Sequence, residues 1–164
     1  MRTLNRLTLG KEIGSRSARD LLIDGRSLKE HLERALGRTF AVVSPLGRAT
    51  LEYERSYLFR LLLLEEPELP SGRRELLVCP LCADLGCGCV AAFVEIREGQ
   101  VLWHDFAWES PYDPSVLTCY PHVAFLFDLG QYEAALRGYP EKYPEPEERV
   151  KATRDQPPGG SLRK

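Results

Sequence analysis

Two stretches of alternating side chains, residues 90–97 and 101–108, constrain the fold of this chain more than any other feature. Both have the period-two pattern of a β-strand, and the pair Glu98-Gly99 between them is typical of a tight turn. Each stretch carries large apolar side chains on both faces. We therefore expect this hairpin to lie inside a sheet or beneath a cover.

Residues 27–37 have the clearest helix pattern in the chain. Ser27 and Glu30 have the spacing of a capping box, in which a hydroxyl and a carboxylate each serve a free backbone amide. Gly37 is a natural stop. The same logic predicts a short helix that begins at Asp128.

The other segments have weaker patterns of secondary structure. Residues 50–66 are ambiguous between a helix and a buried strand, and we favour a helix that ends in an extended piece. We expect strands at residues 20–24, 39–44, 74–79 and 122–127, a strand end and turn at 8–14, and loops at 67–72 and 109–121. Together these patterns predict an α+β fold, with a mainly antiparallel sheet around the central hairpin and two or three packed helices.

Composition divides the chain into two parts. Residues 1–138 suit a single α+β domain, whereas residues 139–164 contain five prolines and eleven charged residues among few apolar ones. A segment of that kind is expected to be an extended or disordered tail.

Overall charge argues against nucleic acid as a partner. Lys plus Arg is 22 and Asp plus Glu is 24, which gives a net charge of -2, whereas phosphate neutralisation needs a clustered positive surface. The longest purely aliphatic run, residues 61–64, is too short to cross a bilayer, and residues 1–11 hold no apolar stretch typical of a secretory signal. We therefore expect a cytoplasmic protein, and the sequence leaves its oligomeric state open.

The most unusual segment is C-P-L-C-A-D-L-G-C-G-C at residues 79–89, which holds four of the five cysteines. In a cytoplasmic chain such cysteines are expected to be reduced thiols or metal ligands rather than disulfides. Two tetrahedral ligand sets can be written. The local set is Cys79, Cys82, Cys87 and Cys89. The distributed set is Cys79, Cys82, Cys119 and His122.

Each ligand set has its own geometry. In the local set only four residues separate Cys82 from Cys87, which is cramped for one ion, although Gly86 and Gly88 permit close backbone approach. In the distributed set C-P-L-C and C-Y-P-H form two turns that the hairpin could bring together, as in a zinc ribbon. Thiolate and imidazole ligands make zinc the expected cofactor.

Two other interpretations of the cysteines stay open. Buried cysteine often acts as a small apolar side chain, so the cluster can be purely structural. Thiol redox chemistry is the other alternative, but a hairpin follows the C-x-x-C instead of the βαβ unit expected for that chemistry.

Little else in the sequence points to catalysis. Strict alternation places His104 and Asp105 on opposite faces of their strand, so we do not expect them to form a dyad. Asp84 is interpreted as a residue that bonds the amides of its loop. Gly86-Cys87-Gly88 is a lone G-x-G that no helix pattern follows, which excludes a dinucleotide-binding loop.

The strings C-P-L-C-A-D-L-G-C-G, V-L-W-H-D-F-A-W-E and F-D-L-G-Q-Y-E-A-A-L-R together resemble a set of small bacterial proteins of unassigned activity. That set is built around a C-P-x-C-x-D-L-G-C-G segment. The resemblance spans residues 20–137, and its specific part is residues 79–109. It implies a bacterial origin and brings no chemistry. Cys89 is less typical of the set, and Cys119 and His122 lie outside the closely matching part.

The sequence alone therefore favours a small cytoplasmic binding or interaction protein with a structural cysteine-rich site, and zinc is the metal it would hold. An unidentified protein is the expected partner. The alternative is a thiol- or metal-dependent enzyme that uses the cluster at residues 79–89.

Overall fold

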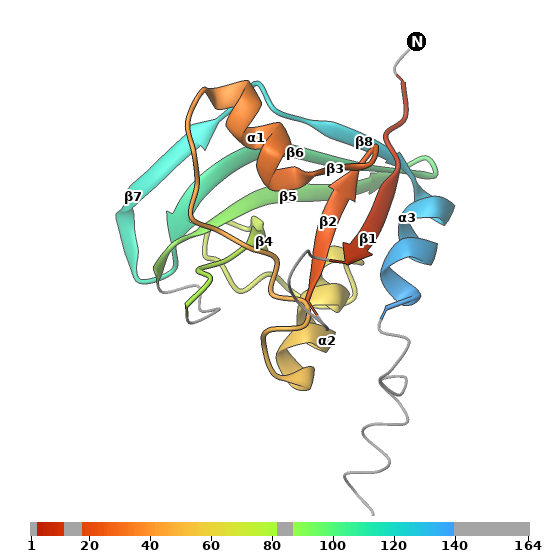
Figure 1. Ribbon diagram of the computed structural model, residues 1–164, viewed down its shortest axis with the longest axis horizontal. Coiled ribbons are helices and arrows are strands. Elements are labelled where there is room, and N and C mark those ends of the chain that lie inside the picture. Colours follow the sequence, from red (N-terminus) through yellow and green to blue (C-terminus); the bar gives the residue numbers. More distant parts are fainter. Residues whose placement is uncertain (1–2, 12–17, 82–86, 140–164) are drawn as a thin grey trace, which may run out of the picture.

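The computed structural model of the chain describes residues 3–11, 18–81 and 87–139 (Figure 1). Within these ranges the chain forms three helices and two antiparallel sheets, of three and five strands. In chain order the elements are β1 (Leu7–Lys11), β2 (Arg19–Ile23), β3 (Arg26–Ser27), α1 (Leu28–Leu36), α2 (Leu51–Leu61), β4 (Arg74–Leu77), β5 (Cys89–Arg97), β6 (Gln100–Ser110), β7 (Asp113–Tyr120), β8 (Phe125–Asp128) and α3 (Leu129–Arg137). The α+β class is confirmed, although the strands form two sheets where one was expected.

The predicted hairpin is confirmed as β5 and β6, which form the centre of the five-stranded sheet. Its turn is made by Glu98 and Gly99, which have φ angles of 52° and 77°. That conformation is typical of a turn whose twist matches that of the flanking strands. Strand β4 pairs with the free edge of β5, so both hairpin strands lie inside the sheet as expected.

Two strands share the second edge of β6. β8 pairs with its first half and β7 with its second half. The prediction of a loop over residues 109–121 was therefore wrong, because residues 113–120 form β7. Seven of these eight residues are exposed, so the strand has no apolar face to produce an alternating pattern.

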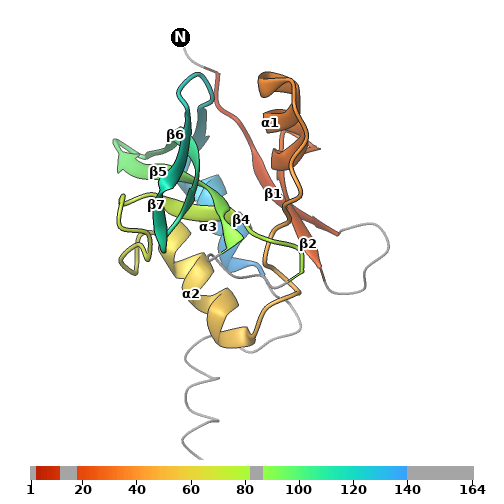
Figure 2. The same ribbon diagram turned by 90° about the vertical axis from the view of Figure 1, so that its left-hand side faces the viewer.

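The second sheet, β1–β2–β3, lies on the other side of the molecule with α1 beside it (Figure 2). α1 begins as predicted: the Ser27 hydroxyl accepts a hydrogen bond from the Glu30 amide at 3.0 Å. Gly37 ends the helix with a φ of 64°. The two sheets meet at Asn5, whose amide donates to the Leu126 carbonyl oxygen at 2.6 Å.

Two predicted segments differ from the structure. α2 ends at Leu61, and Leu63 has a φ of 60°, so the four-leucine run leaves the helix in a turn rather than as an extended piece. The strand expected at residues 39–44 is reduced to one bridge, in which the backbone groups of Val43 and Val78 exchange hydrogen bonds of 2.9 and 2.7 Å. That bridge covers the outer edge of β4.

The core lies between the two sheets and the helices. The fully buried Trp103 of β6 donates from its indole nitrogen to the Tyr132 hydroxyl of α3 at 3.1 Å. That hydroxyl in turn donates to the Leu61 carbonyl oxygen at the end of α2, at 2.7 Å. One short chain of hydrogen bonds thus connects the sheet to two helices. No helix in the described ranges is long and apolar enough to span a membrane.

Candidate functional site

The cysteine-rich segment connects β4 to β5. Leu77 lies opposite Val90 in the antiparallel pair, so the connection starts and ends at one end of the five-stranded sheet. This register brings Cys79, Cys87 and Cys89 to that end, which we call the cysteine end. Cys82 and Asp84, together with residues 83, 85 and 86, lie outside the described residues.

At Gly88 the backbone of the cysteine end packs closely against Trp108 of β6. It has a φ of 96°, and a Cβ at this position would lie 2.4 Å from Cζ2 of Trp108. Only glycine combines this backbone conformation with such a close approach. The expectation of close backbone approach is thus confirmed for Gly88.

Cys89 is fully buried in a small apolar cluster with Leu69, Val78 and Ala91. Burial, followed by the negative charges of Glu75 and Glu109, raises the pKa of the Cys89 thiol well above its usual value of 9.0. A low-dielectric site disfavours the thiolate, so Cys89 is a protonated thiol at neutral pH.

The predicted ligands of a metal are brought together only in part. The register places Cys79, Cys87 and Cys89 at the same end of the sheet, while Cys119 lies on β7 opposite Ala107. Within residues 3–11, 18–81 and 87–139, no group of three or more histidine, cysteine, aspartate or glutamate side chains could hold a metal ion. Because Cys82 belongs to both ligand sets and lies outside these ranges, both sets stay predictions.

None of the four described cysteines is in a disulfide with another of them. Cys87 and Cys119 are exposed, Cys79 is partly buried and Cys89 is buried. Their environments therefore differ strongly, and thiol reactivity is expected to differ with them.

A polar cluster on the outer face of the sheet supports the cysteine end. Arg73, which is 8% exposed, donates from Nε to the Asp105 carbonyl oxygen at 2.7 Å. Its Nη1 lies 3.5 Å from a Glu109 carboxylate oxygen, which also accepts from the Ser71 hydroxyl at 2.9 Å. Its Nη2 lies 3.9 Å from the sulfur of Cys119. This cluster ties the loop before β4 to β6 and β7.

The outer face also carries a carboxylate–imidazole–carboxylate group. His104 contacts Asp105 through Nδ1 at 2.8 Å and Glu95 through Nε2. The prediction that His104 and Asp105 point apart was wrong. The register between β5 and β6 shifts at this point, and Asp105 has a φ of 51°, so a β-bulge places both side chains on one face. Alternation then resumes with Phe106 buried.

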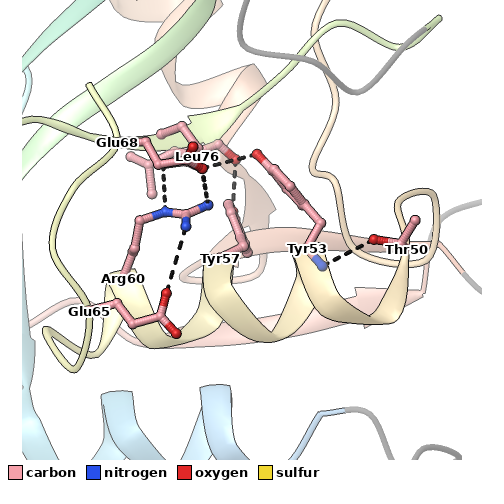
Figure 3. A network of polar contacts seen from close by, with 8 residues as sticks. Thr50, Tyr53, Tyr57, Arg60, Glu65, Glu68 and Leu76 are labelled. Atoms are coloured by element: carbon pink, nitrogen blue, oxygen red, sulfur yellow. Dashed lines mark hydrogen bonds and ion pairs between the residues drawn. The ribbon is translucent and has the colours of Figure 1, made fainter. Parts of the chain in front are cut away.

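A third network lies between α2 and β4 (Figure 3). Arg60 contacts the buried Glu75 with two hydrogen bonds, from Nε at 3.2 Å and from Nη2 at 2.5 Å. The Tyr53 hydroxyl donates to the same carboxylate at 3.0 Å. Glu68 lies 3.2 Å from Arg60 and Glu65 lies 4.0 Å from it, both nearer to solvent.

The electrostatics of this network follow from burial. Burial alone would lower the pKa of Arg60, but its hydrogen bond to Glu75 and the charge of that carboxylate raise it. Burial, and next the charge of Glu75, raise the pKa of Tyr53. Arg60 is therefore a permanent cation and Tyr53 a permanent hydrogen-bond donor, which makes the network a structural connection between α2 and β4.

Two exposed apolar side chains lie at the cysteine end. Leu81, in the β4–β5 connection, is 94% exposed, and Tyr112, in the turn between β6 and β7, is 77% exposed. β4 ends and β7 begins at the same end of this antiparallel sheet (Figure 1), so Leu81 and Tyr112 both lie near that end. At these exposures neither side chain packs closely against the described part of the chain.

No family model, no curated protein and no solved structure matches this chain. The contact between Ser71 and Glu109 carried no signal in the sequence, because these residues are 38 positions apart. The exposure of Leu81 and Tyr112 likewise depends on the fold.

Proposed function

We propose that this chain is a small binding protein that recognises a protein partner with its cysteine end. The observation that carries the proposal is the exposure of Leu81 and Tyr112 on two loops at that end. Apolar and aromatic side chains presented on loops by a rigid scaffold are typical of protein-binding surfaces.

The supporting structure behind these loops fits that role. The close contact between Gly88 and Trp108 holds one loop against β6. The hydrogen bonds of Ser71 and Arg73 to Glu109 and to the Asp105 carbonyl hold the neighbouring segment. A preorganised surface loses less conformational entropy on binding than a mobile one.

In this proposal the cysteines have a structural role, and a zinc ion bound by Cys79, Cys82 and two further ligands fixes the loop that carries Leu81. Thiolate ligands favour zinc, and a closed four-ligand site supplies folding energy rather than chemistry. This role places the protein in a reducing compartment, the cytoplasm, because metal binding requires reduced cysteines.

The binding proposal is tested by comparing partners retained from a cell extract. The double variant Leu81→Ser/Tyr112→Ser removes both exposed side chains. Ile96→Ser is the matched control, because Ile96 is also exposed and apolar but lies at the opposite end of the hairpin. We expect a partner that is retained by the wild type and by the control and lost by the double variant. Equal retention by all three proteins would contradict the proposal.

The ligand sets are separated by single substitutions. Cys82→Ser removes a ligand common to both sets and should abolish zinc binding in either case. Cys87→Ser should weaken it only if the local set holds the metal, and Cys119→Ser only if the distributed set does. Zinc content after dialysis is the measurement, and zinc that survives Cys82→Ser would exclude both sets.

A further inference from the structure

A cavity of about 380 Å³ lies between β1 and the C-terminal half of α3. These two elements lie side by side, on the opposite side of the molecule from β7 (Figure 1). The volume falls within the range of ligand-binding sites. The cavity is separate from the cysteine end, so a ligand bound there would be independent of the partner proposed above.

The backbone of β1 presents alternate residues to the cavity. The Arg6 carbonyl oxygen accepts a hydrogen bond from the Asp24 amide at 2.9 Å, so the backbone of Arg6 faces the β2 side. The pairing of β1 with β2 continues from there in regular register. Because backbone direction alternates along a strand, Leu7 and Leu9 turn their N–H and C=O groups to the outer edge of β1, toward α3.

The first part of this outer edge is already paired. The Asn5 amide donates to the Leu126 carbonyl oxygen of β8 at 2.6 Å. At Leu7 the side-chain amide of Gln131 accepts from the N–H at 3.0 Å and donates to the carbonyl oxygen at 2.5 Å. A residue of a neighbouring antiparallel strand would make these same two hydrogen bonds. The Gln131 side chain therefore takes the place of an added strand at this position.

Leu9 is the next residue on the outer edge, about 6.6 Å further along the strand, and it lines the cavity. Within the described part of the chain, no hydrogen bond reaches its N–H and C=O on this side. Unpaired backbone groups on a strand edge are a template for pairing with another chain. The cavity thus lies where the covered part of the β1 edge ends.

The opposite wall of the cavity leaves room for a chain. On the α3 side the lining includes three small residues, Ala134, Ala135 and Gly138. From Gln131 to Gly138 the helix rises about 10 Å, which is the length of roughly three residues of extended chain. The Leu9 side chain, which packs against the core, adds apolar surface.

We propose that this cavity binds a short extended peptide segment of a partner protein, which adds a strand to β1 at Leu9. The ligand must offer a carbonyl oxygen and an N–H at strand spacing, and a peptide does so with its backbone alone. The alanine and leucine walls favour a segment with a compact apolar side chain. Because Gln131 occupies the pairing position at Leu7, the bound segment ends or turns away there.

The probe that tests this proposal is acetyl-Thr-Val-Thr-amide, which is uncharged and consists of residues with high β-propensity. Titration into the full chain should shift the Leu9 amide resonance to saturation and protect that amide from hydrogen exchange. Ala134→Leu fills the cavity and should weaken the affinity at least about tenfold. Arg137→Leu is the matched control, because Arg137 is also on α3 and half-exposed but does not line the cavity.

Two N-methylated probes test backbone pairing on the unaltered protein. One carries the methyl group on the valine nitrogen, and the other carries methyl groups on both threonine nitrogens. Only alternate backbone groups of a strand face its neighbour, so one of the two probes should lose at least about tenfold more affinity than the other. This comparison does not depend on the folding of any variant.

Four results would each overturn the proposal. The first three are no saturable shift at Leu9, an equal loss of affinity in Arg137→Leu, and equal affinities of the two N-methylated probes. The fourth is a Leu9 amide that is already protected from exchange without peptide. Protection that persists on dilution would assign the edge to another segment of this chain, and protection lost on dilution would assign it to a second copy.

Discussion

The backbone of Gly88 lies directly against the indole ring of Trp108, so close that a Cβ at residue 88 would lie 2.4 Å from the ring. This contact packs the last residues of the β4–β5 connection against β6. Because Cys87 and Cys89 flank Gly88, the positions of both depend on the contact.

Gly88→Ala should destabilise the protein by about 2–5 kcal/mol. The substitution combines the strain of an alanine at positive φ, roughly 1–2 kcal/mol, with the displacement of a packed indole, roughly 1–3 kcal/mol. Gly99→Ala is the matched control, because Gly99 also has a positive φ but has nothing within 4 Å of an added Cβ. It should cost only the backbone strain. Urea denaturation measures both, and equal losses would show that the indole contact is unimportant.

Glu75→Gln should cost about 3–5 kcal/mol, because it leaves the buried Arg60 without its main charge partner. Glu68→Gln should cost less than about 1 kcal/mol, since Glu68 is 54% exposed at the outer side of the same guanidinium. The double variant Arg60→Met/Glu75→Leu should recover most of the loss. If both single variants had the same free energy of unfolding, the pair would not be the main connection between α2 and β4.

Stability should fall as the pH rises above about 10. Burial, followed by the charge of Glu75, raises the pKa of Tyr57 above its usual value of 10.0. The folded state therefore keeps the proton at a pH where the unfolded chain releases it, and each such tyrosine contributes a loss of about 1.4 kcal/mol per pH unit. This contribution to stability is complete below the unfolded pKa and is lost above it.

Tyr57→Phe isolates that contribution. It removes the hydrogen bond from the Tyr57 hydroxyl to the Leu76 carbonyl oxygen, 2.8 Å long, so the variant should be about 1 kcal/mol less stable at pH 7. Its stability should decline less steeply above pH 10, and the two curves should converge. Thermal unfolding from neutral to alkaline pH measures this, and parallel curves would contradict the assignment.

The cysteines should react at very different rates. Cys119 is exposed and Cys89 is completely buried. Alkylation of Cys89 requires opening of the sheet, so it should be at least about a thousandfold slower than that of Cys119. Mass spectrometry after timed alkylation gives both rates, and denaturant should equalise them. Comparable rates in the folded protein would show that the apolar cluster around Cys89 opens freely.

Much of the fold could be predicted because the decisive signals are local. The cap at Ser27, the turn at Glu98-Gly99 and the alternation of β5 each depend on residues close in sequence. β7 was missed because nearly all of its residues are exposed, so its strand conformation depends on pairing with β6 rather than on its own pattern.

The candidate site could be predicted less well, for a related reason. The bulge at Asp105 reverses the alternation of β6. It is visible in the strand register of the structure and has no signal in the sequence. The contacts of Arg73 with Glu109 and Cys119 join residues 36 and 46 positions apart. Such contacts are fixed by the order of strands in the sheet, which a single sequence does not specify.

Zinc content decides whether a metal fixes the cysteine end. We expect one equivalent of zinc in wild-type protein purified without chelator, and none in the Cys82→Ser variant prepared in the same way. Chelation should lower the melting temperature of the wild type and leave that of the variant unchanged. Wild-type protein that contains no zinc, and whose stability a chelator does not alter, would contradict the claim that a metal fixes the cysteine end.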